Sequence, residues 1–160
     1  MLATLAEPPT SGRGLVYEPK YDGIRAIVSI DKGKKKSPGD VTVWSRNGND
    51  KTLQFPEIVR ALQAIAARVP HRVVLDGEIV AIHSGGRPLG FQQIQGRIHL
   101  TSAGDIARAA QAHPAALILF DLLLDGDVDL RREPLVARRL RLQQRVKPRA
   151  AEQPFVRLSE

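Results

Sequence analysis

The sequence has 160 residues, of which 42% are hydrophobic and 26% charged, a composition that excludes a disordered chain. It contains no cysteine, which excludes disulfide bonds and thiolate metal sites and fits a cytosolic protein. No apolar run approaches membrane-spanning length and no signal-peptide pattern opens the chain, while the formal net charge of +7 favours polyanionic partners such as nucleic acid or nucleotide phosphates.

Hydrophobic periodicity predicts mostly strands in the first half of the chain. Ile24, Ala26, Val28 and Ile30 alternate with other residues and would share one face of a strand. After an irregular lead over residues 1–13, strands are expected at 15–20, 24–30, 41–46 and 72–82, and a helix at about 56–68. Between two of these strands, residues 31–40 form a turn-rich loop with Lys34, Lys35 and Lys36, which we interpret as solvated.

The second half of the chain contains more helix. An almost unbroken apolar run at 115–126 indicates a strand buried on both faces. Helices are expected at 91–98, 103–112 and 134–146, with Pro134 in the first turn of the last one, and a final strand begins at 155–158. This order of elements predicts an α+β fold with mostly antiparallel β-sheets flanked by helices.

The stretch "EPKYDGIRA" places polar residues where strand-like sequence would otherwise continue. If residues 16–20 are extended, Glu18 and Lys20 point to the same side. A lysine acts as a nucleophile only after losing a proton, and its ordinary pKa of about 10.4 must be depressed by burial or by cations such as Arg25. Gly23 would let another backbone or a ligand approach closely. These residues alone are equally compatible with an exposed turn.

Three further stretches have residues that suit a nucleotide site. Arg46 precedes the turn Asn47-Gly48 and is either a surface hairpin residue or a phosphate ligand. Asp76 and Glu78 share one face of an apolar strand, which is costly unless they are paired or near a cation. Phe120 lies in the apolar run and is either a core residue or a platform on which a base stacks.

The motifs "KYDGIR", "SRNG", "LDGEIV" and "LILFDLL" follow one another in the order and spacing of the covalent nucleotidyltransferases. This superfamily contains the ATP-dependent DNA ligases, the RNA ligases and the mRNA capping enzymes. "MLATLAE", "FQQIQGRI" and "DLLLDGDVDLRREPLVARRLRL" resemble bacterial end-joining ligases of the ligase D type. The resemblance covers essentially all of the chain and implies a nucleotidyltransferase (ATP-grasp-like) adenylation subdomain.

The resemblance implies a covalent mechanism. Lys20 would attack the α-phosphate of ATP and carry AMP, with Mg²⁺ neutralising charge, before AMP moves to a DNA 5′-phosphate and a 3′-hydroxyl displaces it. Asp22 and Asp76 would be supporting acids, oriented towards Lys20, Arg25 or a metal-bound water. The remaining assignments are nucleotide contacts: Glu18 at the adenine edge, Phe120 stacked on adenine, Glu78 on the ribose hydroxyls, and Arg25 and Arg46 on ribose or phosphates, with Arg46 also near the 5′-phosphate of a nick.

The family also has a strand with a metal-binding glutamate, a strand with phosphate-binding lysines and an oligonucleotide-binding-fold (OB-fold) domain, which this sequence does not contain. We therefore expect residues 1–160 to be a partial adenylation domain, without metal ligands of its own and weakly active alone. The resemblance implies nicked or broken double-stranded DNA as partner, together with Ku and with polymerase or nuclease domains. It also implies a role in DNA repair, recombination and non-homologous end joining. The location implied is the bacterial nucleoid in the cytoplasm. The alternatives are an RNA ligase, a capping guanylyltransferase, or a non-catalytic fragment that binds nucleotide or DNA.

Overall fold

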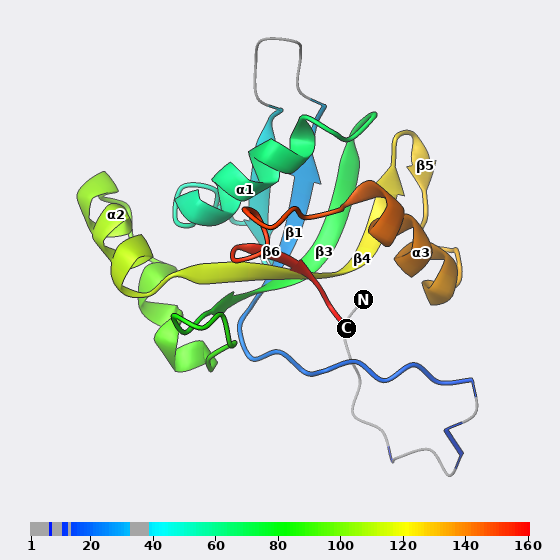
Figure 1. The fold of residues 1–160 in the computed structure, drawn as a ribbon, viewed down its shortest axis with the longest axis horizontal. Coiled ribbons are helices and arrows are strands. Elements are labelled where there is room, and N and C mark those ends of the chain that lie inside the picture. The colour runs from blue at the N-terminus through cyan, green and yellow to red at the C-terminus, as the bar shows by residue number, and fades with distance from the viewer. Residues whose placement is uncertain (1–6, 8–10, 13, 33–38) are drawn as a thin grey trace.

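The computed structural model describes residues 7, 11–12, 14–32 and 39–160 of the chain (Figure 1). Lys34, Lys35 and Lys36, which we expected in a solvated loop, lie outside the described residues. Within the described part, no helix is both long and apolar enough to cross a membrane.

A six-stranded sheet forms the centre of the fold (Figure 1). Its main path is antiparallel throughout, and one short strand pairs in parallel with the long fourth strand. In spatial order the strands are β2 (Val41–Ser45), β1 (Ile24–Ile30), β3 (Val73–Ala81), β4 (Ala115–Asp125) and β5 (Val128–Asp129), with β6 (Val156–Leu158) beside β4. The predicted α+β class with mostly antiparallel sheet is therefore confirmed.

Three helices and two 3₁₀ turns accompany the sheet. They are α1 (Pro56–Ala66), α2 (Ala103–Ala112) and α3 (Leu135–Arg145), with η1 (Phe91–Gln93) and η2 (Gln95–Arg97). Pro56 occupies the first turn of α1, where its missing N–H costs nothing. Ser102 caps α2 by accepting a hydrogen bond from the Asp105 N–H. The segment expected as one helix at 91–98 is instead a pair of 3₁₀ turns.

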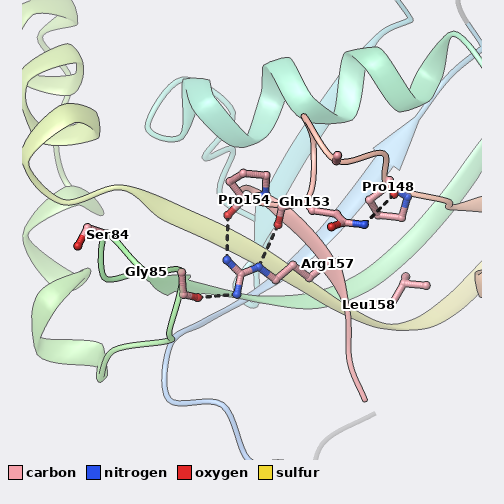
Figure 2. A pocket seen from close by; sticks show the side chains of 9 residues that line it. Ser84, Gly85, Pro148, Gln153, Pro154, Arg157 and Leu158 are labelled. Atoms are coloured by element: carbon pink, nitrogen blue, oxygen red, sulfur yellow. Dashed lines mark hydrogen bonds between the residues drawn. The ribbon is translucent and has the colours of Figure 1, made fainter.

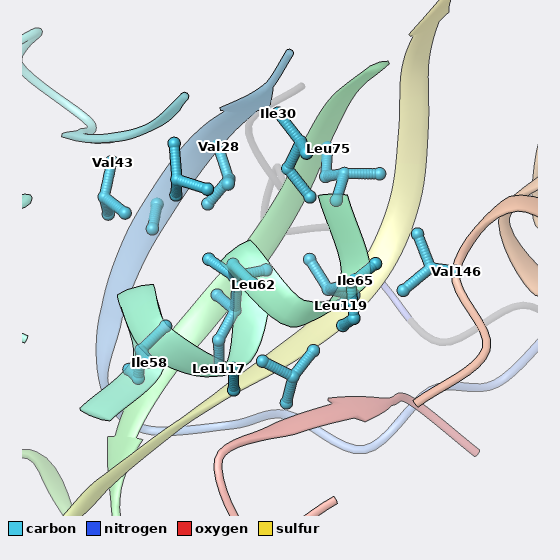
Figure 3. Packing of buried hydrophobic residues seen from close by; sticks show 14 of the residues in the cluster. Val28, Ile30, Val43, Ile58, Leu62, Ile65, Leu75, Leu117, Leu119 and Val146 are labelled. Atoms are coloured by element: carbon cyan, nitrogen blue, oxygen red, sulfur yellow. The ribbon is translucent and has the colours of Figure 1, made fainter. Parts of the chain in front are cut away.

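The main hydrophobic core lies between α1 and one face of the sheet (Figure 3). Ile58, Leu62 and Ile65 recur at helical spacing and are fully buried against the strands. They meet inward-facing strand residues such as Leu75 and Leu117, which belong to the same cluster. Because successive strand residues point to opposite faces, this packing determines which side chains face the other way.

The opposite face of the sheet carries a smaller apolar cluster that contains Val80 and Ile118, with Tyr21 packed against it. β4 is buried on both faces, as its apolar run predicted. The alternation that sends Leu75 and Ile79 towards α1 places Asp76 and Glu78 on this second face.

The strand expected at residues 15–20 is not formed. This segment has no regular structure, and Leu15, Val16 and Tyr17 are exposed. In Figure 1 it continues from the start of β1 and runs outside the sheet. A strand needs a neighbour for its backbone hydrogen bonds, and both edges of β1 are already paired with β2 and β3.

The hairpin that adds β5 was not predicted. Gly126 adopts φ +65° in the turn, a left-handed conformation that glycine tolerates. The chain then reverses direction after Asp125, and Val128 pairs with it.

Candidate active site

A cavity of about 520 Å³ opens where the start of β1, the centre of the sheet and α3 meet. Four residues predicted for the site line it, although they lie far apart in the sequence. Arg25, Glu78 and Phe120 come from three strands, and Glu18 comes from an irregular segment. β1, β3 and β4 are adjacent, and Arg25 is paired with Glu78 across the first two of them. The full lining is Glu18, Pro19, Tyr21, Arg25, Glu78, Phe120, Asp121, Leu135, Arg138 and Ser159.

A second cavity is larger, at about 740 Å³, but it contains none of the residues predicted for the site (Figure 2). It lies between the turn at 84–86 and residues 148–158. The Arg157 guanidinium there donates to the carbonyl oxygens of Gly86 and Gln153, at 2.5 and 3.0 Å. These contacts hold loop backbone in place, so the chemistry is assigned to the smaller cavity.

Arg25 is fixed by Asp76. Its Nε and Nη2 atoms donate to the two carboxylate oxygens at 2.9 and 2.6 Å, and Asp76 is only 2% exposed. The hydrogen bonds to Asp76 are the largest cause of a raised pKa for Arg25, so it remains cationic. The guanidinium also lies 5.2 Å from the centre of the Phe120 ring, within the range of a cation–π contact. Asp76 therefore supports Arg25, one of the three orientations considered for it.

Glu78 has a different environment from Asp76. It is half-buried in the cavity wall, and burial raises the pKa of its carboxyl group. A backbone hydrogen bond from Gly23 and the charge of Arg25 oppose this rise without cancelling it. Glu78 thus lines the cavity with a carboxyl group whose charged form is disfavoured by burial.

The segment around Lys20 is held at the residues on either side of the lysine. Glu18 accepts a hydrogen bond from Arg139 at 2.7 Å, and Asp22 accepts one from the Phe91 N–H at 3.1 Å. Lys20 is exposed, and its neighbours Pro19 and Tyr21 line the cavity. The expected strand is absent here, but Glu18 still lines the cavity, and Lys20 lies in the chain between two lining residues.

Gly23 sits against the backbone of β3. A Cβ atom there would lie 2.9 Å from Val80 Cγ1 and closer still to the carbonyl oxygen of Ile79. The sequence-based interpretation that this glycine permits a close approach is confirmed, and the approaching group is protein backbone.

Four predicted site residues do not line the cavity: Lys20, Asp22, Asp76 and Arg46. Lys20, Asp22 and Asp76 adjoin residues that do, whereas Arg46 does not. It is exposed in the turn after β2, where the Gly48 N–H donates to the Ser45 carbonyl oxygen and Gly48 has φ +76°. Its position is that of a surface hairpin arginine.

Sequence reasoning missed the contribution of α3. Arg138 donates to both carboxylate oxygens of Asp121 at 2.8 Å, and both residues are buried. Arg139 contacts Glu18, and Arg145 binds Asp125 on β4. The available signal was Asp121 itself, because a carboxylate inside an apolar run needs a cationic partner.

Comparison with known proteins identifies the family. Residues 1–160 match the sequence profile of the ATP dependent DNA ligase domain. The chain belongs to this family. It is 38% identical to a DNA ligase of Pyrobaculum calidifontis over 82% of the chain and 21% of the relative, and 41% identical to DNA ligase C of Mycobacterium tuberculosis over 79% of the chain and 32% of the relative. The chain thus spans about a fifth to a third of the curated relatives.

Solved structures agree with this assignment. The fold matches a mycobacterial DNA ligase D complexed with ATP and MES, with a TM-score of 0.63 and 30% identity over 89% of this chain and 38% of that chain. It also matches the ligase domain of LigD from M. tuberculosis, with a TM-score of 0.61 and 26% identity over the same shares. The resemblance to DNA ligases of the ligase D type is therefore confirmed.

Proposed function

We propose that this chain carries the adenylation chemistry of an ATP-dependent DNA ligase, with Lys20 as the acceptor of AMP. The lysine nitrogen forms a bond to the α-phosphorus, pyrophosphate leaves, and the lysine loses its proton. AMP then passes to a DNA 5′-phosphate and is displaced by a 3′-hydroxyl. The observation that carries the proposal is the convergence of Arg25, Glu78 and Phe120 in one cavity beside the Lys20 segment.

The cavity suits the nucleoside part of ATP. Phe120 offers an aromatic face for adenine, and such stacking contributes about 1–3 kcal/mol per base. The half-buried Glu78 carboxylate can accept hydrogen bonds from the ribose hydroxyls. Glu18 is proposed at the adenine edge, and Arg25, oriented by Asp76, beside the ribose or phosphates.

The phosphates require further positive charge. Arg46 is proposed to contact them, or the 5′-phosphate of a nick, from the turn after β2. Mg²⁺ is proposed to enter with the triphosphate and neutralise its charge, because the described residues contain no group of three or more His, Asp or Glu side chains that could hold a metal ion.

The rate of the reaction on residues 1–160 is expected to be low. The resemblance implies phosphate-binding lysines that these residues do not contain, which is why we propose that they form a partial adenylation domain. Each lost stabiliser of transition-state charge typically costs about 10²–10³-fold in rate.

The wider role follows from the similarity to ligase D. We propose nicked or broken double-stranded DNA as the substrate, which the net charge of +7 suits. The same proposal includes DNA repair and non-homologous end joining at the bacterial nucleoid. It also includes Ku and polymerase or nuclease domains as partners.

The decisive experiment is labelling with α-³²P-ATP and Mg²⁺ at high protein concentration. Label should appear on the wild type, disappear in Lys20→Ala and persist in Lys51→Ala, since the Lys51 ammonium binds the Ile98 carbonyl oxygen outside the cavity. Label that survives Lys20→Ala refutes the nucleophile. A wild type that binds ATP without any label would favour the non-catalytic alternative, and one that does neither would refute the proposal as a whole.

A further inference from the structure

Arg139 connects three separate parts of the chain at the rim of the cavity. It projects from α3, and its side chain is 17% exposed. One guanidinium nitrogen donates to Glu18 Oε1 at 2.7 Å and to the Phe120 carbonyl oxygen at 3.3 Å. The other donates to the Ser159 carbonyl oxygen at 2.8 Å. Arg139 therefore joins the segment of the nucleophile to the strand that carries the aromatic platform.

The segment on which Arg139 acts has little other support. Residues 14–20 have no regular structure and are exposed. Between these residues and residues 39–160, the contact with Arg139 is the one hydrogen-bonded link that the structure describes. On the other side of the lysine, Asp22 is bound to the Phe91 N–H. Lys20 thus lies midway between two attachment points.

The link between Glu18 and Arg139 is suited to fix a position. It is a hydrogen bond between two charged groups at the surface of the protein. The Arg139 side chain is the more buried of the two, and two carbonyl oxygens also hold its guanidinium. A guanidinium with fixed partners loses less freedom on pairing than a solvated side chain would. Small displacements of a reacting group can cost about 10²-fold in rate.

We propose that Arg139 is a positioning residue for the nucleophile: through Glu18 it holds the Lys20 segment against the cavity. The proposal rests on the adenylation function proposed above. It predicts that Arg139 acts on the rate of AMP transfer at saturating ATP, and that it acts through Glu18 rather than by a contact with the nucleotide.

The test compares Arg139→Met, Glu18→Gln and the double variant. The rate of Lys20 labelling at saturating ATP should fall about 10-fold or more in Arg139→Met, within the range for a misplaced group. The double variant should be no slower than the slower single variant, because both changes act on the same link: methionine removes the donor, and glutamine removes the charge of the acceptor. Arg139→Lys, which retains the charge, should recover part of the rate. Arg145→Met is the matched control, since Arg145 lies on the same helix but pairs with Asp125 away from the cavity.

A second measurement does not depend on ATP chemistry. Limited trypsin digestion with mass spectrometry reports cleavage after Lys20, which should be faster in Arg139→Met and unchanged in Arg145→Met. Unchanged cleavage after Lys20 in Arg139→Met would overturn the proposal, as would an unchanged labelling rate, or rate losses in the double variant that simply multiply. If the adenylation function is itself wrong, label is absent or survives Lys20→Ala, and the digestion still decides whether Arg139 holds the segment.

Discussion

Replacing Gly23 by alanine should separate the Lys20 segment from the sheet. The added Cβ would lie 2.9 Å from Val80 Cγ1 and nearer still to the Ile79 carbonyl oxygen, and real Cβ atoms essentially never come within 3.0 Å of another heavy atom. The obstacle is backbone of β3, which cannot rotate away as a side chain can. Overpacking of this kind costs about 1–3 kcal/mol, and for a chain of this size that lowers the melting temperature by roughly 2–12 °C.

The same change should impair the site. Gly23 donates a backbone hydrogen bond to Glu78, so displacing it disturbs a cavity-lining carboxylate. Urea unfolding and ATP titration of Gly23→Ala measure both effects. Gly96→Ala is the matched control, because no heavy atom lies within 4 Å of its added Cβ, and it should be neutral or stabilising by about 0.4–1 kcal/mol. A Gly23→Ala protein as stable as the wild type, with unchanged ATP affinity, would refute the reasoning.

Three other changes test the site and its support. Phe120→Ala should weaken ATP binding by about 1–3 kcal/mol in a titration; a large loss of stability with unchanged affinity would instead make Phe120 a core residue. The pKa of Glu78 is raised in the folded protein, so folding favours the protonated carboxyl group. The contribution of Glu78 to the free energy of unfolding is therefore present below the ordinary pKa of 4.5 and is lost as pH rises through the raised pKa. Glu78→Gln should therefore melt higher than the wild type at pH 7, and a difference that does not shrink at acid pH would contradict this. Glu57→Met should cost about 3–5 kcal/mol in urea unfolding, because it leaves the charge of Arg97 buried without its partner; a loss below about 1 kcal/mol would show that the pair is dispensable.

The parts of the fold that sequence predicted well are those set by local pattern. Alternation identified β1, and helical spacing of apolar residues identified α1. Asp76 and Glu78 attracted attention because carboxylates in an apolar strand are costly. The structure supplies the reason in each case, which is Arg25 for Asp76 and an open cavity for Glu78.

The parts that sequence did not predict depend on partners far along the chain. The strand expected at 15–20 has suitable residues, but it leads into β1, whose two edges are already paired with β2 and β3, and only the sheet order reveals that pairing. Arg139 reaches Glu18 across 121 residues, and Arg138 reaches Asp121 across 17. A helix face rich in arginine is compatible with solvent, DNA or buried carboxylates, and tertiary packing selects among them.

The pattern of ion pairs around the cavity indicates how charge must be supplied during the proposed reaction. Three arginines at the cavity are already hydrogen-bonded to carboxylates, so their charge is largely balanced before a nucleotide binds. Glu78 has no such ion pair with an arginine, and burial raises the pKa of its carboxyl group. In the proposed reaction a nucleoside would occupy this cavity with its hydroxyls facing Glu78, and the paired arginines, Arg25 among them, would supply only part of the positive charge that a triphosphate needs. We propose that the remaining negative charge of the triphosphate is met by Lys20, by Mg²⁺ and by cations outside the cavity such as Arg46. The three ion pairs that these arginines form are Arg25–Asp76, Arg138–Asp121 and Arg139–Glu18.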